Sequence, residues 1–422
     1  MQFQRVRLTQ LRPWHHVAIF LLAFVVIVLR RPDAVLHAQF WAEDGHVWYA
    51  DAYNLGWWPA LFRAQDGYFQ TLPRLAAAFA LLLPLSLAPL ALNVAAICIQ
   101  ALPVNLLLKS CSTAWGSLRF RALLAGIYLA LPNSREMDAI VSSSQWLLAL
   151  CAFLLLVAAT PERVAGRLFV ISALLLCGLS GPFCFFLLPV AVFLAWRNRD
   201  RWRALLASLL AVPCLLQACG LLLVNHSGRA HAILGATPGL FVRILAGHVF
   251  LGALIGSNVL ASNPSLGLFI FLLCIAILGI AVTAACCADA CIEMKIFVLF
   301  SFVLLTAACI SPAAYPPPGV SRWDLLVHTP GIRYWFFPTL AFAWSIAYLL
   351  VSSKPLLKLA GSYLLFFLCI AIIRGWEYPA FKDLNFAEDA KRVESARPGT
   401  EFTLPQNPDG WTIRLAKRHG RQ

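Results

Sequence analysis

The residues best suited to chemistry are two adjacent carboxylates in the polar segment 30–74. The run 40–46 reads FWAEDGH and places Glu43 beside Asp44. Neighbouring side chains on a helix diverge by about 100°, so these two are not expected to share one proton as a dyad. One carboxylate is predicted to act as a general base that activates an acceptor hydroxyl. The alternative is that the pair only caps a helix or carries solvated charge.

Aromatic and basic residues accompany these acids. The segment 30–74 also contains Trp41, Trp48, Tyr49, Trp57 and Trp58. Such rings form an interfacial belt in many membrane proteins, and they also stack on sugars or cover a lipid headgroup. Arg74 and Arg333 each lie beside the start of an apolar run, where a guanidinium can hold phosphate bidentately or extend to ordinary phospholipid. His328 has no partner at zinc-ligand spacing and is the weakest of these candidates.

The composition excludes a soluble fold. Of the 422 residues, 61% are hydrophobic and 12% are charged, and the mean hydropathy is +0.77. Stretches such as 204–224 and 266–288 run about twenty residues without an acidic or basic group, the length that crosses about 30 Å of hydrocarbon as a helix. These features indicate an all-α, polytopic transmembrane helical bundle.

The charges fit a membrane protein better than a nucleic-acid-binding one. The net charge is +14, but the basic clusters are short and lie between apolar runs, as in the positive-inside pattern. All 19 acidic residues lie outside the apolar cores, whereas ion-coupled transporters usually keep carboxylates at mid-membrane. Most of the 13 cysteines lie inside apolar runs, and Cys286, Cys287 and Cys291 lack a second ligand pair, so no metal site is predicted.

Apolar runs predict ten clear spans and leave two regions ambiguous. The spans are 14–29, 119–131, 146–158, 168–180, 182–196, 204–224, 266–285, 296–312, 334–352 and 359–373. The region 71–108 is too long for one helix and too short for three, and 243–262 is apolar but contains His248 and Asn258. The number of crossings therefore needs a second argument.

Charge counts favour a cytoplasmic N-terminus. If 71–108 crosses an odd number of times and 243–262 does not cross, the cytoplasmic segments are 1–13, 109–121, 159–167, 197–203, 286–295 and 353–358. Their 58 residues hold 15 Lys and Arg, whereas the 121 residues of the opposite loops 30–74, 132–145, 225–265 and 313–333 hold 9. We expect about eleven crossings, with thirteen as the alternative, and a retained first span, with a signal peptide as its alternative.

Two domains of unequal size follow from this topology. Residues 1–373 are predicted to form the transmembrane helical domain, whose external loop 30–74 carries the acidic motif, and 374–422 a polar external tail. Within the tail, 402–411 has strand-like and turn-like signals, which predict either a lid over the external face or a small β element without a role. The run 178–183, GLSGPF, is predicted to form a tight external turn.

This arrangement resembles the GT-C membrane glycosyltransferases. One span precedes a long external loop that opens with an acidic motif, ends in Arg-Leu and is followed by many further spans. The matching residues are Glu43-Asp44, Gly67-Tyr68 and Arg74-Leu75, and more loosely Glu136 and Arg333-Tyr334. The chain departs from some members in lacking a large soluble C-terminal domain and a second clear acidic metal-binding pair. No cofactor is therefore predicted, and the need for a divalent metal stays open.

The resemblance implies transfer of a sugar from a polyprenyl-phosphate donor to a glycan, lipid or protein acceptor. The expected location is the extracytoplasmic face of a bacterial inner membrane. Asp44 would be the base, with Glu43 as its substitute, and Asp44→Asn is predicted to abolish transfer. The residues expected to bind substrate or lipid phosphate are Arg74, Arg333, Tyr334, Glu136, His328 and Tyr68.

Two other classes compete with this interpretation. A lipid-linked oligosaccharide flippase, or another multi-span transporter without catalysis, would use the same scaffold, with the Gly and Pro residues at 178–182 as hinges. A structural or assembly protein of the membrane is the third class. Substitutions that abolish function would fall on loop carboxylates in an enzyme and on intramembrane polar or Gly positions in a transporter.

Overall fold

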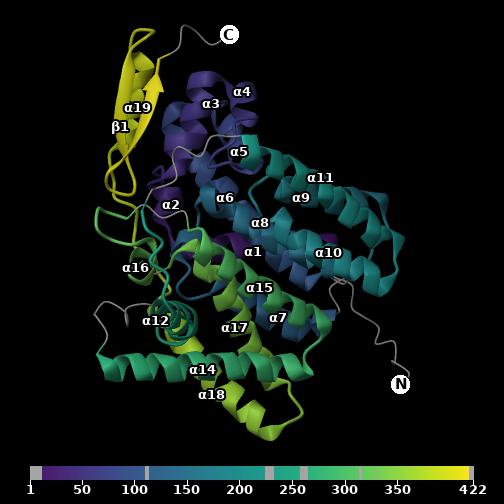
Figure 1. Ribbon diagram of the computed structural model, residues 1–422. Coiled ribbons are helices and arrows are strands. Elements are labelled where there is room, and N and C mark those ends of the chain that lie inside the picture. Colours follow the sequence, from purple (N-terminus) through teal and green to yellow (C-terminus); the bar gives the residue numbers. More distant parts are fainter. Residues whose placement is uncertain are drawn as a thin grey trace.

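Helices form almost all of the regular structure (Figure 1). The computed structural model describes residues 12–109, 114–223, 232–256, 265–312, 316–329 and 331–417. The helices at the ten clear predicted spans are α1 (Pro13–Arg30), α7 (Leu118–Leu129), α8 (Ser144–Val157), α9 (Val164–Gly178), α10 (Cys184–Asn198), α11 (Arg201–Leu223), α14 (Leu266–Asp289), α15 (Ile292–Ile310), α17 (Phe336–Leu350) and α18 (Pro355–Arg374). A further long helix, α6 (Ala88–Leu108), lies in the ambiguous region 71–108. The prediction of a helical fold is confirmed.

Six helices among the described residues are long and apolar enough to cross a membrane: α1, α6, α11, α14, α15 and α18. This fits the prediction of a multi-pass membrane protein. The other predicted spans correspond to shorter helices, from 12 residues in α7 to 15 in α17. The total number of crossings therefore stays a prediction.

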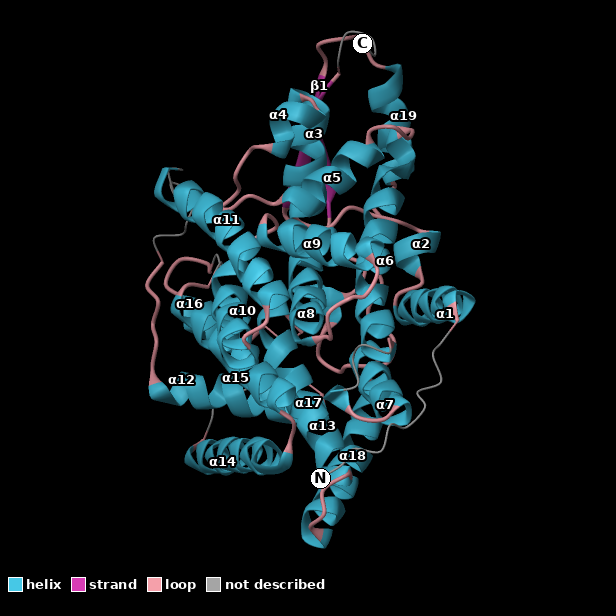
Figure 2. Cartoon of the chain, turned by 90° about the vertical axis from the view of Figure 1, so that its right-hand side faces the viewer, coloured by secondary structure: helices cyan, strands magenta, loops and turns pink. Residues whose placement is uncertain are grey.

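The two ambiguous regions differ in structure. The region 71–108 contains the ten-residue α5 (Thr71–Ala80), a short turn and then α6, which is the only one of these long enough to cross. The described part of the second region, 243–256, lies mostly on one continuous helical stretch of α12 (Pro238–Arg243), the π-helix η6 (Ile244–Leu251) and α13 (Gly252–Leu254). Residues 257–262, which include Asn258, lie outside the described residues. The helical stretch runs across α14: α12 is seen end-on in Figure 1, and α14 is seen end-on in Figure 2.

Segments predicted to share one side of the membrane contact each other. On the predicted cytoplasmic side, the Thr160 hydroxyl lies 3.4 Å from Asp200 Oδ2, and Lys354 Nζ lies 3.9 Å from Asp289 Oδ2. On the opposite side, Asn133 Nδ2 donates to the His248 carbonyl at 2.8 Å, which joins two predicted external loops. The grouping of the segments matches the charge-based prediction, while the absolute orientation stays a prediction.

The core between the helices is aromatic at its centre. The Trp344 ring packs 4.7 Å from Phe297 and 5.4 Å from Trp115, measured between centroids, and Phe153 lies 5.2 Å from Phe297. These buried rings join α8, α15 and α17. A second buried cluster joins the first loop, α5, α6 and the tail, which fixes the loop that carries the acidic motif.

The first loop is a chain of short helices and the tail packs against it. The loop contains α2 (Asp33–Leu36), the π-helix η1 (Asp44–Tyr49), α3 (Ala50–Leu55) and α4 (Trp57–Leu61). The tail contains α19 (Phe386–Ser395) and an antiparallel hairpin of β1 (Glu401–Gln406) and β2 (Trp411–Ala416). Figure 1 shows this hairpin beside α3 at one end of the molecule. The strand-like signal at 402–411 thus corresponds to a real hairpin.

Candidate active site

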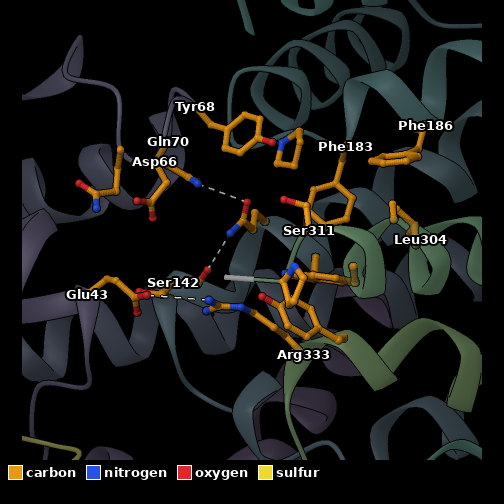
Figure 3. Close-up of a pocket in the computed structure, with 18 of the residues that line it drawn as sticks. Glu43, Asp66, Tyr68, Gln70, Ser142, Phe183, Phe186, Leu304, Ser311 and Arg333 are labelled. Carbon is orange, nitrogen blue, oxygen red and sulfur yellow. Dashed lines mark hydrogen bonds and ion pairs between the residues drawn. The ribbon is translucent and has the colours of Figure 1, made fainter. Parts of the chain in front are cut away.

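A cavity of about 220 Å³ lies where the predicted external segments meet (Figure 3). Its polar lining consists of Glu43, Gln65, Asp66, Tyr68, Gln70, Ser142, Gln145, Ser311, Arg322, Arg333 and Tyr334. Its apolar lining consists of Trp48, Trp146, Pro182, Phe183, Phe186, Leu304, Ala307, Ala308 and Pro312. Figure 3 shows Glu43 and Asp66 at one end and Phe186 and Leu304 at the other. The cavity therefore suits a ligand with a polar head and an apolar part.

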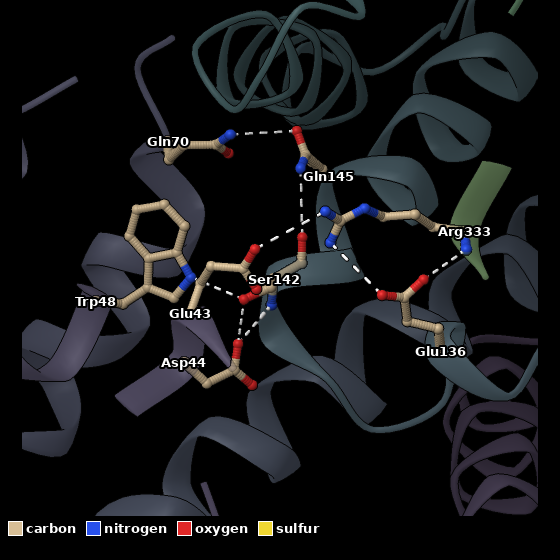
Figure 4. A network of polar contacts seen from close by, with 8 residues as sticks. All are labelled: Glu43, Asp44, Trp48, Gln70, Glu136, Ser142, Gln145 and Arg333. Atoms are coloured by element: carbon tan, nitrogen blue, oxygen red, sulfur yellow. Dashed lines mark hydrogen bonds and ion pairs between the residues drawn. The ribbon is translucent and has the colours of Figure 1, made fainter. Parts of the chain in front are cut away.

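Arg333 lies between two carboxylates at the polar end (Figure 4). Its Nη2 is 3.8 Å from Glu43 Oε1, and its Nη1 is 3.8 Å from Glu136 Oε1. Glu136 Oε2 also accepts the Arg333 backbone N–H at 2.7 Å, which fixes both residues at the start of η8 (Arg333–Trp335). Burial alone would lower the pKa of Arg333, but Glu136 and Glu43 raise it above its ordinary value. The guanidinium therefore stays charged.

Asp44 points away from the cavity and caps a helix. Its Oδ2 accepts the Val141 N–H at 3.0 Å, and its Oδ1 accepts the Ser142 N–H at 2.9 Å and the Ser142 hydroxyl. These N–H groups begin η5 (Val141–Ser143), which continues into α8 and leaves its first donors without helical acceptors. Burial raises the pKa of Asp44 to about 7, although its three hydrogen bonds lower it. Asp44 therefore supports Ser142, which lines the cavity.

The two adjacent acids thus have different surroundings, as their divergence on a helix predicts. The Glu43 side chain is 25% exposed and lines the cavity, whereas Asp44 is 1% exposed. Figure 4 shows Ser142 between Asp44 and the cavity-facing Glu43. The sequence-based choice of Asp44 as base stays a prediction, and in the structure Glu43 rather than Asp44 lines the cavity.

Asp66 and Tyr68 reach the cavity through a two-residue turn. The backbones of Gln65 and Tyr68 exchange hydrogen bonds of 2.8 and 3.0 Å across Asp66 and Gly67, which have φ values of 53° and 86°. An Asp-Gly pair with both φ values positive is typical of a tight hairpin turn. This turn projects the polar side chains on either side of Gly67 toward the cavity.

A buried glutamine in α11 holds this turn in place. Gln217 is fully buried, and its Oε1 accepts the Phe69 N–H at 2.8 Å. Its Nε2, with two N–H donors, lies 3.1 to 3.2 Å from the carbonyl oxygens of Phe69, Gly178 and Gly181. One amide therefore joins a membrane-length helix, the first loop and the turn that follows α9.

The run 178–183 forms the tight turn expected from its sequence. Its Ser180 Oγ accepts the Leu72 N–H at 3.0 Å, so the turn packs on the start of α5. Gly181 has a φ of 107°, and a Cβ at this position would overlap the Gln145 side chain. Glycine is therefore required for the turn to approach the cavity wall.

Arg74 lies behind the cavity rather than in it. Its side chain is 1% exposed, its Nη1 is 3.1 Å from Asp51 Oδ2, and its guanidinium lies 5.1 Å from the centre of the Trp48 ring. Trp48 lines the cavity and donates its indole N–H to Ser142 Oγ at 2.9 Å. Arg74 therefore supports a cavity wall through Trp48.

The other predicted binding residues are divided between the cavity and its surroundings. Tyr68, Arg333 and Tyr334 line the cavity, and Glu136 lies behind Arg333. His328 does not line it: its Nδ1 lies 2.8 Å from the Asp324 carbonyl, at the end of α16 (Arg322–Val327). The structure therefore brings together Glu43, Tyr68 and the 333–334 pair.

Several polar lining residues were not among the predicted binding residues. Asp66 had an available signal, because Asp-Gly between two polar residues predicts a turn that exposes its side chains. Gln145 and Arg322 lie in the predicted external loops 132–145 and 313–333, a position that allowed them to converge on the same face but did not identify them as lining residues. In the described part of the chain, no group of three or more His, Cys, Asp or Glu side chains could hold a metal ion.

No protein-family model matches this chain, and no curated protein matches it.

Proposed function

We propose that this protein is a membrane glycosyltransferase that moves a sugar from a polyprenyl-phosphate donor to an acceptor hydroxyl on the extracytoplasmic side. The observation that carries the proposal is the amphipathic cavity, with Glu43 and Arg333 at one end and apolar side chains of α10 and α15 at the other. A lipid-linked sugar has the same division into a polar head and a long apolar chain.

Glu43 is the proposed general base. Its carboxylate would take the proton from the acceptor oxygen while that oxygen bonds to C1 of the sugar. The bond between C1 and the phosphate oxygen breaks in the same step, and the polyprenyl phosphate leaves with its negative charge. Arg333, whose Nη2 lies 3.8 Å from Glu43 Oε1, would orient the carboxylate before the acceptor arrives.

Arg322 is the proposed site for the donor phosphate. Arg333 already faces two carboxylates, whereas Arg322 forms no ion pair with any carboxylate in the described ranges. Its Nη1 has a long contact of 3.5 Å with the Pro312 carbonyl, and its Nε has no hydrogen-bond partner among the described residues. A guanidinium whose N–H donors lack strong acceptors can donate two parallel hydrogen bonds to a phosphate.

The apolar chain of the donor would leave the cavity along α15. Leu304, Ala307 and Ala308 line the cavity, and Ala307 also lines a shallow apolar groove of about 350 Å³ on the outside of the same helix. Ile310 in this groove is 66% exposed, as expected for a side chain that faces lipid. The cavity and the groove together would provide a lateral route from the membrane to the polar end if the wall at Ala307 opens.

The experiment is a transfer assay with purified protein in liposomes. A panel of radiolabelled polyprenyl-phosphate hexoses is supplied, and release of polyprenyl phosphate is followed by thin-layer chromatography. Loss of a general base lowers turnover by about 10² to 10⁴-fold, so Glu43→Gln should fall by that amount. The matched control is Glu162→Gln, an exposed carboxylate between α8 and α9.

The same assay distinguishes a glycosyltransferase from a flippase. The proposal that the protein is an enzyme is supported if the wild type and Glu162→Gln both turn over and Glu43→Gln does not. A flippase would instead move a fluorescent lipid-linked sugar across the liposome membrane and release no polyprenyl phosphate. If this movement occurs and is unaffected by Glu43→Gln, the protein is a flippase and the proposal is wrong.

A further inference from the structure

The C-terminal hairpin holds the backbone on both sides of Glu43. Ala42 N–H donates to the Asn407 carbonyl at 2.6 Å, and Gln406 Nε2 donates to the Ala42 carbonyl at 2.6 Å. Beyond Glu43, His46 Nδ1 lies 2.6 Å from the Thr412 carbonyl. The tail therefore binds the chain immediately before and shortly after the cavity-facing carboxylate.

The backbone at Ala42 needs such support. Its φ is 42°, in the left-handed region that residues with a side chain rarely adopt. An unfavourable conformation persists only where surrounding contacts hold it. The Ala42 N–H is held by Asn407, directly after β1, and the Ala42 carbonyl accepts from Gln406 of β1 and, at a longer 3.2 Å, from the His46 N–H. The direction of the Glu43 side chain follows from this backbone.

We infer that Gln406 is a positioning residue, which directs Glu43 into the cavity by holding the Ala42 carbonyl. Gln406 is 3% exposed and lies on the side of β1 that faces the first loop. Gly45 packs against it so closely that a Cβ at Gly45 would overlap the Gln406 amide. Asn407 is a less specific probe, since its side-chain amide also holds the Lys382 backbone within the tail.

The first readout is physical and does not depend on the proposed function. Hydrogen–deuterium exchange is measured on peptides that cover 40–49 in the full-length protein. Gln406→Ala should raise the exchange rate of these amides at least about ten-fold, while Thr403→Ala, at an exposed position of the same strand, should leave it unchanged. Unchanged exchange at 40–49 in Gln406→Ala overturns the inference.

The second readout is catalytic and rests on the proposed function. Gln406→Ala should lower kcat about ten-fold, the rate equivalent of one lost buried hydrogen bond, without changing KM for the lipid donor. A fall in stability without a kcat effect, in protein that is still folded, would assign Gln406 a purely structural role and overturn the inference.

Gln406→Glu provides a rescue. A protonated carboxyl group can donate to the Ala42 carbonyl as the amide does, whereas a carboxylate cannot. The ratio of the variant's kcat to that of the wild type, taken at the same pH, should therefore rise as the pH falls. A ratio independent of pH contradicts the inference. If the wild type transfers no sugar, the proposed function fails and the exchange measurement alone decides the role of Gln406.

Discussion

Removing the Asp44 carboxylate should destabilise the protein rather than remove its base. Asp44→Ala leaves the Val141 and Ser142 N–H groups without their acceptor at the start of the η5–α8 helix. Each buried donor left unsatisfied costs about 1–3 kcal/mol, so the expected loss of unfolding free energy is about 2–6 kcal/mol. Asp44→Asn keeps one acceptor oxygen and should lose about half as much.

The assay pairs unfolding with transfer. Unfolding in detergent is followed by tryptophan fluorescence, and transfer is measured below the unfolding temperature. Glu43 is 25% exposed and makes one long ion pair, so Glu43→Gln should change stability by less than about 1 kcal/mol while abolishing most turnover. Asp44→Asn should keep measurable turnover.

The opposite pattern would refute this reasoning. If Asp44→Asn abolishes transfer at unchanged stability and Glu43→Gln retains it, Asp44 is the base, as the family resemblance predicts. If Asp44→Ala is as stable as the wild type, the hydrogen bonds to Val141 and Ser142 do not matter for folding.

Three further outcomes are expected. Burial raises the pKa of Asp44 from its ordinary 3.8 to about 7, so the stability that this group contributes is full below about pH 4 and is lost as the pH rises through 7. The unfolding free energy of the wild type should therefore fall by up to about 4 kcal/mol between pH 4 and 8. Chemical unfolding of Asp44→Asn should not show this fall. Gln217→Leu leaves the N–H and carbonyl groups of Phe69 without their amide partner. Limited proteolysis should therefore cut the 62–70 segment faster than in the wild type. Equal cleavage rates would show that Gln217 does not hold this turn in place. Ala307→Trp enlarges the side chain that lines both the cavity and the groove, so KM should rise for a long-chain lipid donor and stay constant for a short-chain one. Equal effects on both donors would reject the lateral route.

The helices were predictable because hydrophobic length is a strong signal. Apolar runs located α11 and α14 to within four residues, and the charge pattern grouped the loops that contact each other. The short α7 shows where this signal weakens, since 12 residues do not fix whether a helix crosses. Length and charge therefore predicted elements and their grouping, but not the number of crossings.

The site was less predictable because its geometry depends on distant contacts. The sequence indicated that Glu43 and Asp44 would diverge, but which one faces the cavity is decided by the backbone at Ala42 and by the helix start at Val141. In the sequence, Gln217 is a single amide within an apolar run and carries no sign of a special role. Only its hydrogen bonds to Phe69 and Gly178, beside the turns at 65–68 and 178–183, identify that role. Local patterns carry no information on such pairings.

The hairpin also sets when the site can be completed during synthesis. Ala42 emerges early, but its partner Asn407 follows 365 residues later, and at about 5–20 residues per second the delay is on the order of tens of seconds. During that interval the first loop has no β strand to hold it. The contacts that hold Ala42 would thus form only after β1 and Asn407 have been synthesised and have packed against the first loop.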